Sequence, residues 1–149
     1  MRIVELTTEE CKELLTRVSV GRLACALENQ PYVVPVSFAY EKESLYVLST
    51  VGQKIAWMRQ NPKVCLQADE IADRSNWVSV VLTGTYVELR GPDHLGEKER
   101  ARKLLAHASQ WWLTPLAERR EQAGDLAVEP VLFRIQIDSI SGLRAVPEK

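Results

Sequence analysis

The chain has 149 residues, of which 46% are hydrophobic and 26% charged, and its net charge is -1. This length and composition predict one globular domain over residues 1–149, not a disordered chain. The balanced charge gives no general attraction to nucleic acid, and no apolar run reaches the roughly 20 residues of a membrane span. The first residues also lack the apolar stretch of a signal peptide, so we expect a soluble, cytoplasmic protein without nucleic-acid or membrane partners.

The cysteines and histidines favour neither a disulfide framework nor a metal site. Cys11, Cys25 and Cys65 are odd in number and far apart, with no CxxC pair. His94 and His107 have no acid or nucleophile beside them in the sequence. We therefore expect no bound metal and no catalytic triad.

The first predicted element is a helix that begins after residue 7. Thr7 and Glu10 match the capping box S/T-x-x-E, in which each residue caps the backbone of the other. Apolar residues then recur over residues 11–18 at the spacing of one helical face. A helix of about three turns is predicted here.

Residues 23 to 90 predict five β-strands and one short helix. The strands cover residues 23–27, 32–40, 45–49, 64–68 and 77–90, and the helix covers residues 53–60. Pro35 marks an edge strand or a bulge, because proline cannot donate to a sheet ladder. Gly84 predicts a bend or bulge in the fifth strand.

The remaining sequence predicts a helical region and a last strand. An apolar helical stripe runs from Ala101 to Trp112, and a second, charged helical piece begins at Thr114. Residues 131–138 alternate apolar and polar side chains, as a strand with one buried face does. Five or six mostly antiparallel strands with a few helices predict a mainly β, α+β fold, a small barrel with peripheral helices.

The segment from Ser49 to Lys54 has the composition of a phosphate site. Ser49 and Thr50 end a strand, Gly52 makes the turn, and Lys54 stands in the first turn of a helix. Backbone N–H groups at a helix start attract anions, and hydroxyl and ammonium groups donate to phosphoryl oxygens. The alternative is an ordinary strand–turn–helix with a solvated lysine, because the P-loop spacing is absent.

Two other strand segments could face a flat polar ring. A bulge at Pro35 would free backbone groups beside Val36 and Ser37, whereas a plain edge strand would not. Trp77 and Ser79 share one strand face and offer an apolar plate beside a hydrogen-bond donor. Burial of the tryptophan in the core is the alternative.

Taken in order, these segments resemble the pyridoxamine 5'-phosphate oxidase-related superfamily. The resemblance rests on VGRLACALENQPYVVPVSF, LYVLSTVGQKIAWMRQNPKVCLQADE, NWVSVVLTGTYVEL and the final PVLFRIQIDSISGLRA. It covers about residues 15–90 and 130–145 and points to the small FMN-binding split-barrel proteins that include the nitroimidazole reductases. It implies a six-stranded antiparallel split barrel that forms a homodimer, with FMN in two equivalent clefts at the interface.

Position by position, the resemblance implies which residues hold the FMN phosphate. Ser49, Thr50 and Lys54 match the phosphate-binding positions, and Gln53 stands where many relatives have arginine or histidine. Leu48 occupies the position at which the nitroimidazole reductases carry a histidine. This departure disfavours nitroimidazole reduction as the activity.

The resemblance also implies which residues surround the isoalloxazine ring. Val36 and Ser37 match strand positions whose backbone and side chain meet the ring. Trp77, Ser79 and Val80 match the strand that closes the cleft, which the second subunit can supply. No counterpart of the basic residues that hold pyridoxal phosphate in the true oxidases is present, which disfavours pyridoxamine phosphate oxidation.

Three functions remain open on this basis. An FMN-dependent oxidoreductase would pass electrons from a reduced nicotinamide to a small-molecule acceptor. A flavin carrier would bind without turnover, and a structural barrel would bind nothing. No side chain stands out as a general acid or base, so no catalytic residue is predicted. Cofactor F420 or haem could also replace FMN.

Overall fold

An eight-stranded antiparallel sheet dominates the structure, a computed structural model that describes residues 1–107 and 130–148. The strands are β1 (Arg2–Glu5), β2 (Val20–Leu27), β3 (Gln30–Ser37), β4 (Ala39–Glu41), β5 (Ser44–Thr50), β6 (Lys63–Asp73), β7 (Asn76–Glu88) and β8 (Pro130–Val146). The helices are α1 (Thr8–Arg17), α2 (Gln53–Gln60), the 3-10 turn η1 (Pro92–His94) and α3 (Leu95–Ala106). The predicted α+β fold with dominant β structure is confirmed.

The sheet is a split barrel because its two ends do not share a ladder. The strand order is β3-β2-β6-β7-β8-β5-β4, and β1 pairs with β8 beside this path. The predicted strand 32–40 is broken at Phe38, whose backbone N–H donates to the Ser19 carbonyl at 2.8 Å. This break ends β3 on the β2 side and begins β4 on the β5 side. Together with β1, which was not predicted, it raises the six predicted strands to eight.

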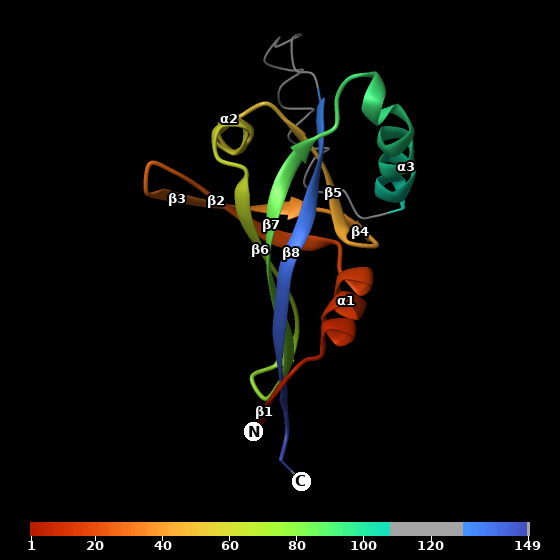
Figure 1. Cartoon of the computed structure of the whole chain (residues 1–149). Coiled ribbons are helices and arrows are strands. Elements are labelled where there is room, and N and C mark those ends of the chain that lie inside the picture. The colour runs from red at the N-terminus through yellow and green to blue at the C-terminus, as the bar shows by residue number, and fades with distance from the viewer. Residues whose placement is uncertain (108–129, 149) are drawn as a thin grey trace, which may run out of the picture.

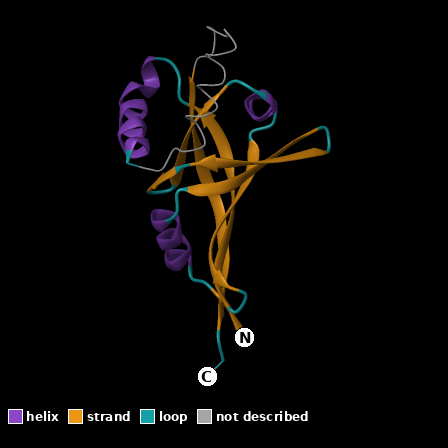
Figure 2. Ribbon diagram, turned by 180° about the vertical axis from the view of Figure 1, so that it is seen from behind, coloured by secondary structure: helices purple, strands orange, loops and turns teal. Residues whose placement is uncertain are grey.

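Three apolar clusters hold the helices on the sheet. The main core lies inside the barrel and includes Phe38, Phe133 and Ile55. A second cluster packs α3 on β5 and β8, and a third packs α1 on β7. Figures 1 and 2 show α1 and α3 along one side of the sheet and α2 on the other.

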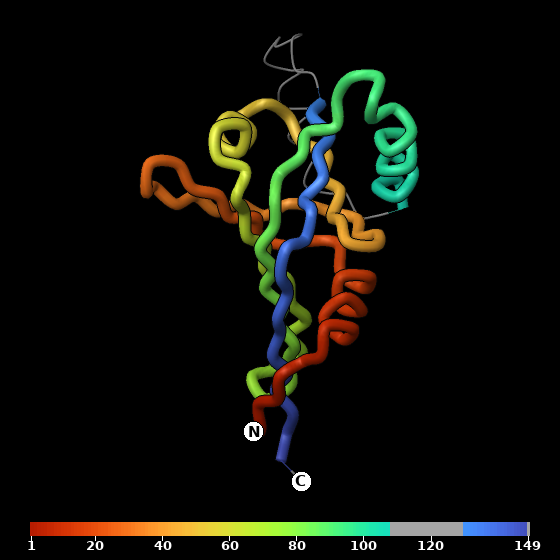
Figure 3. Tube along the Cα trace, in the orientation of Figure 1, coloured from red at the N-terminus to blue at the C-terminus, as the bar shows by residue number. Residues whose placement is uncertain are grey.

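The longest strands, β7 and β8, run side by side through the molecule (Figure 3). Their register shifts between Thr83 and Gly84, which confirms the predicted irregularity at Gly84. A Cβ at Gly84 would lie 2.6 Å from the Gln136 carbonyl oxygen, so only glycine allows this close approach. The irregularity bends the β7–β8 pair, so that these long strands belong to the barrel at one end and continue beyond it at the other.

The predicted helix starts are confirmed. The Thr7 hydroxyl accepts from the Glu10 N–H at 3.2 Å, and the Glu10 carboxylate accepts from the Thr7 N–H at 3.0 Å. Helix α2 has the predicted bounds. The apolar stripe beyond residue 107 and the piece from Thr114 lie outside the described residues. In the part of the chain that is described, no helix is long and apolar enough to span a membrane.

Candidate functional site

The corner between β5 and α2 brings together the residues of the predicted phosphate site. Ser49 and Thr50 pair with Val131 and Pro130 of β8, which fixes the end of β5. Their side chains are 3% and 7% exposed, so two hydroxyls are buried at this corner. The Ser49 hydroxyl donates to the Thr50 carbonyl at 3.4 Å, which is long for an O–H···O bond.

Strand alternation gives the two hydroxyls different surroundings. Ser49 shares its strand face with Val47 of the main core, whereas Thr50 shares its face with Leu48. Leu48 packs against the cluster under α3. Leu48 is therefore part of the apolar wall behind the corner, and the two hydroxyls approach it from opposite sides of β5.

The amino end of α2 differs from that of α1. Its N-cap is Gly52, which offers no side-chain cap, and its first turn contains no acidic residue. In α1, by contrast, Thr7 and Glu10 satisfy the first N–H groups, and acidic residues fill the first turn. An α-helix leaves its first N–H groups without intrahelical acceptors. The α2 start therefore has the donors and the dipole that attract an anion.

Charge at this corner comes from Lys54. Lys54 is half-buried in the first turn of α2, and Gln53 beside it is exposed. The pKa of the Cys25 thiol is raised because of its burial, and the Lys54 ammonium acts on it in the opposite direction. This places the Lys54 charge near β2, on which α2 packs.

The end of β3 lies beside the same corner. Val36 is 4% exposed and belongs to the same core cluster as Val47 and Ile55. The Ser37 hydroxyl is buried, and no described residue forms a hydrogen bond with it. The ladder between β2 and β3 has no register shift, so the bulge at Pro35 was a wrong alternative. Pro35 lies on an edge strand instead, as the other alternative predicted.

The predicted cleft-closing residues lie on β7, away from this corner. Trp77 and Ser79 face the outer side of the sheet and are half-buried. Burial of Trp77 in the core, the alternative prediction, is therefore not observed. Val80 is 1% exposed and points to the opposite side, where it packs with Cys11 and Leu14 of α1. The Val80 side chain is therefore part of the core, and only the backbone of Val80 can line a cleft.

The register of β8 shows how far apart the two halves of the predicted site are. Val131 pairs with Ser49, and Leu143 pairs with Ser79. At a rise of about 3.3 Å per residue, these β8 positions are up to roughly 40 Å apart. Within one chain, the structure therefore joins Val36 and Ser37 to the β5–α2 corner, but it does not bring Ser79 there.

The outer side of β1, β6, β7 and β8 forms an uncovered surface, which we call the open sheet face. Helix α1 packs on the other side of these strands, through Val78 and Val80. Residues directly opposite in antiparallel ladders share a face. The register places on the open sheet face Ile3, Glu5, Gln67, Asp69, Ile71, Trp77, Ser79, Val81, Ser141 and Leu143.

Much of the open sheet face is apolar, and it also carries a polar network that sequence reasoning missed. Ile71 is 68% exposed and Val81 is 42% exposed. The Gln67 side-chain amide donates to Asp69 at 2.8 Å and to the Ser79 hydroxyl at 3.1 Å. Ser79 lies 12 residues after Gln67 in the sequence, so only strand pairing could have revealed that it joins this network.

No described group of three or more His, Cys, Asp and Glu side chains could hold a metal ion.

Comparison with protein families gives a match of residues 7–144 to the model described as pyridoxamine 5'-phosphate oxidase. The chain belongs to this family. The match includes the β5–α2 corner, the end of β3 and the part of the open sheet face that β6, β7 and β8 contribute up to residue 144.

Two relatives resemble this family member along nearly its whole length. A FAD-binding protein from Mesorhizobium loti has a solved structure with 41% identity and a TM-score of 0.76, and the match covers 99% of each chain. The uncharacterized protein RA0666 of Rhizobium meliloti (strain 1021) is 39% identical over 147 residues, which cover 94% of this chain and 93% of the relative. The chain is thus homologous to a protein named for binding a flavin.

A more distant structure shares the fold alone. It is a protein of Bacteroides thetaiotaomicron VPI-5482 named for 5-nitroimidazole antibiotic resistance, with 17% identity and a TM-score of 0.67. The match covers 97% of this chain and 89% of that one. At this identity the likeness supports the split-barrel architecture and says nothing about the reaction.

Proposed function

We propose that this chain is an FMN-binding oxidoreductase that works as a homodimer, with the FMN phosphate at the amino end of α2. One observation carries the proposal: α2 begins without a side-chain cap or an acidic residue, beside the buried hydroxyls of Ser49 and Thr50. A dianionic phosphate would accept hydrogen bonds from the helix start and from the Thr50 hydroxyl, and also from Ser49 in place of its long bond to the Thr50 carbonyl. Lys54 would supply the compensating charge.

The end of β3 fits the ring of the same cofactor. The Ser37 hydroxyl is buried without a partner among the described residues, and a buried hydroxyl in that state is costly unless a ligand meets it. Val36 beside it presents a backbone held by the β2 ladder. A flat heterocycle edged with polar atoms would satisfy Ser37 and cover the apolar wall behind it.

A second copy of the chain would complete the cleft. Trp77 and Ser79 of β7 pair with the far end of β8, whereas the β5–α2 corner pairs with its beginning. They are therefore too far away to cover a ring that the same chain holds at the corner. They lie on the open sheet face, where exposed Ile71 and Val81 favour burial against another protein surface. In a two-fold dimer each surface contributes twice, so two equivalent clefts would form.

The chemistry would come from the cofactor and the positioning from the protein. A bound flavin supplies reversible electron transfer, here from a reduced nicotinamide to a small acceptor. The described groups at the corner are hydroxyls, an ammonium and apolar side chains. None of them is a carboxylate or imidazole placed for general acid–base catalysis, and this favours a non-catalytic flavin carrier as the second candidate function.

The cofactor can be identified from purified protein. We expect the absorption spectrum of a flavin, and mass spectrometry of the released molecule to give FMN. Release of FAD would keep the flavin assignment and correct its form, as the name of the Mesorhizobium loti relative suggests. Release of haem or F420, or failure to bind any flavin on titration, would refute the proposal.

The phosphate site can be tested with Lys54→Ala. We expect FMN binding to weaken by about 1.5–3 kcal/mol, the value of a hydrogen bond to a charged group. Riboflavin lacks the phosphate, so its affinity should not change. Lys103→Ala, at an exposed position of α3, is the matched control. Equal FMN affinity in the wild type and the Lys54 variant would remove Lys54 from the phosphate site.

The dimer can be tested on the open sheet face with Val81→Asp. We expect sedimentation to show a wild-type dimer and a monomeric variant that has lost FMN affinity. Leu95→Asp changes an apolar side chain that is 60% exposed on α3 and should leave the dimer intact. A monomeric wild type, or a monomeric variant with full FMN affinity, would contradict the shared cleft.

Turnover separates the two candidate functions. Mixing the loaded protein with NADH or NADPH under anaerobic conditions should bleach the flavin absorbance. A flavin that never bleaches with either donor would favour the carrier.

A further inference from the structure

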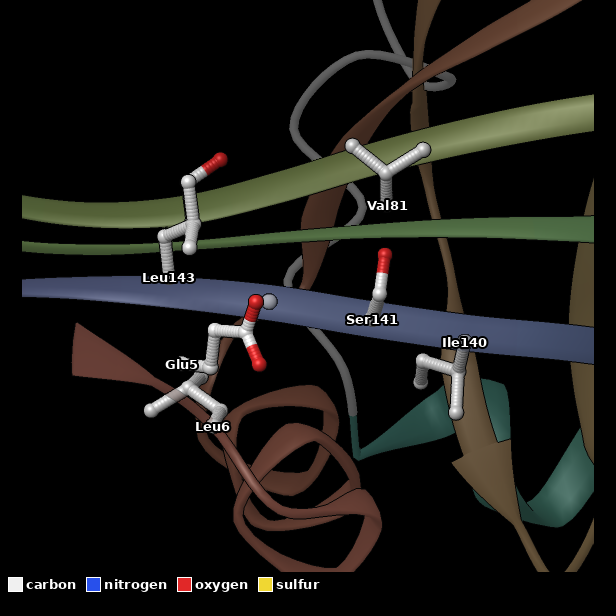
Figure 4. A pocket seen from close by; sticks show the side chains of 8 residues that line it. Glu5, Leu6, Val81, Ile140, Ser141 and Leu143 are labelled. Atoms are coloured by element: carbon white, nitrogen blue, oxygen red, sulfur yellow. The ribbon is translucent and has the colours of Figure 1, made fainter.

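A pocket of about 400 Å³ opens on the face of β7 and β8 beside β1 (Figure 4). Its lining combines a carboxylate, hydroxyls and an apolar wall, contributed by Glu5, Leu6, Ser79, Val81, Ile140, Ser141, Gly142 and Leu143. This volume lies within the usual range of small-molecule sites. Ser79 lines this pocket, and it also belongs to β7, the strand proposed to close the flavin cleft.

The local backbone fixes the shape of this pocket. The Leu6 N–H donates to the Gly142 carbonyl at 2.9 Å, where the chain passes from β1 to α1 across β8. A Cβ at Gly142 would lie 2.8 Å from a methyl group of Leu6 and 2.9 Å from the Ser79 carbonyl oxygen. Glycine thus allows the β1–α1 corner to pack directly on β8. The wall formed by Leu6 is therefore in place before any ligand binds.

The polar groups of the pocket have defined roles. The Ser79 hydroxyl accepts from the Gln67 amide at 3.1 Å, which leaves its own hydrogen to donate. In Figure 4 the Glu5 carboxylate lies between the side chains of Leu143 and Ser141. Glu5 is the one charged side chain among the lining residues. It would attract a cationic group and repel a phosphate or carboxylate.

We infer that this pocket is the acceptor subsite of the flavin held by the other copy, and that Glu5 selects cationic ring compounds over anionic ones. The inference rests on the proposed function, because only the dimer brings the pocket to a flavin. An aromatic or aliphatic ring would lie on Leu143, which is 43% exposed. An amine on that ring would meet Glu5, and a polar ring atom would accept from Ser79.

The charge selection can be measured with three probes of one shape: benzylamine, benzyl alcohol and benzoate. Each is titrated calorimetrically into the FMN-loaded protein, and the flavin absorbance is recorded in the same titration. We expect benzylamine to bind at least about 10-fold more tightly than benzoate, as one charge-assisted contact allows. Binding should also shift the flavin spectrum, because the subsite adjoins the ring.

The matched variants are Glu5→Gln and, as a control, Glu99→Gln at an exposed position of α3. Glu5→Gln should reduce the preference for benzylamine over benzoate to less than about threefold, and Glu99→Gln should leave it unchanged. FMN affinity should be the same in all three proteins, because Glu5 is proposed to contact the acceptor and not the cofactor. Equal binding of the three probes to the wild type, or an unchanged preference in Glu5→Gln, would overturn the charge selection.

The remaining outcomes separate this inference from the proposed function. Binding of benzylamine without any shift of the flavin spectrum would refute the acceptor subsite and leave FMN binding intact. A protein that binds no flavin would refute the proposed function and, with it, the subsite as an acceptor site. If that protein still bound benzylamine in calorimetry and Glu5→Gln did not, the pocket would be an amine site that depends on Glu5 and has no part in flavin chemistry.

Discussion

Replacing Glu88 with alanine would remove a carboxylate that ties α2 to β7. Its Oε1 accepts from the Tyr86 hydroxyl at 2.6 Å and from Arg59 Nε, near the end of α2, at 2.8 Å. Its Oε2 forms an ion pair with Arg90 Nε at 2.5 Å. The Glu88 side chain is 10% exposed, and Tyr86 is 7% exposed. The substitution therefore leaves a buried phenol without its acceptor.

The expected cost has one large part and two small ones. A buried hydroxyl that loses its partner costs about 1–3 kcal/mol. Arg59 and Arg90 are 37% and 68% exposed, so water can replace the carboxylate. Each of their ion pairs contributes about 0.2–1 kcal/mol. We expect Glu88→Ala to lower the free energy of unfolding by about 2–4 kcal/mol, with a fall in Tm of about 2–4 °C per kcal/mol.

Urea denaturation of Glu88→Ala, Tyr86→Phe and the double variant measures the coupling between the two residues. Tyr86→Phe removes the hydroxyl, so Glu88→Ala should cost less in that background. We expect a coupling energy of about 1 kcal/mol or more, because the two groups share a buried hydrogen bond. Additive effects within about 0.3–0.5 kcal/mol would refute the reasoning.

The same carboxylate gives a pH dependence with a definite sign. Burial raises the pKa of Glu88, but the hydrogen bonds from Arg59 and Tyr86 outweigh burial and hold the pKa below its ordinary value of 4.5. A carboxyl whose pKa is lower in the folded state stabilises the protein above the unfolded pKa and loses that effect as the pH falls. The difference in stability between wild type and Glu88→Ala should therefore shrink in acid, below about pH 4.5.

Three further substitutions test local geometry by urea denaturation. Gly84→Ala would place a Cβ 2.6 Å from the Gln136 carbonyl oxygen and should destabilise the protein by about 1–3 kcal/mol, the cost of overpacking. Gly96→Ala, in the first turn of α3 with nothing within 4 Å of the added Cβ, should stabilise it by about 0.5–1 kcal/mol. Equal stability of these two variants would contradict the close approach at β8. Thr7→Ala removes the cap of α1 and should cost about 1 kcal/mol, whereas Thr8→Ala should cost less.

Local rules predicted the elements whose residues determine their own structure. The capping box at Thr7 and Glu10 needs only residues three apart, and it defines the start of α1 as predicted. Alternation identified the central strands, because one face of each is buried in the barrel. The irregularity at Gly84 followed from the absence of a side chain there. These features depend on short stretches of chain, so the sequence alone was sufficient.

Elements that depend on distant pairing were not predicted. All four residues of β1 are exposed, and it becomes a strand because it pairs with the far end of β8. The strand that alternation predicted over residues 131–138 continues to Val146, since β7 and β1 flank its second half; only the family resemblance of residues 130–145 had implied this length. The intervening Ser139–Gly142 stretch has the composition of a turn. The Glu5 pocket depends on this pairing, so no local pattern could have shown it.

The predicted site residues fall into the same two classes. The sequence from Ser49 to Lys54 is contiguous, and its arrangement as strand end, turn and helix start is confirmed. Its distance from Ser79 depends on the register of β8 with two neighbours, which a single sequence does not contain. The local arrangement of the corner could therefore be predicted, but its distance from Ser79 could not.

The isolated chain has three unfavourable features: a buried hydroxyl without a partner among the described residues, an uncapped helix start, and exposed apolar surface. The Ser37 hydroxyl is buried without a partner among the described residues, although alanine would fill that place at no such cost. Helix α2 lacks the cap that α1 has, and Val81 and Ile71 expose apolar surface on the open sheet face. An anionic ring cofactor would satisfy the first two, and a second copy of the chain would cover the third. In the proposed dimer the corner of one copy meets the open sheet face of the other, so flavin binding and dimer formation would be one coupled equilibrium.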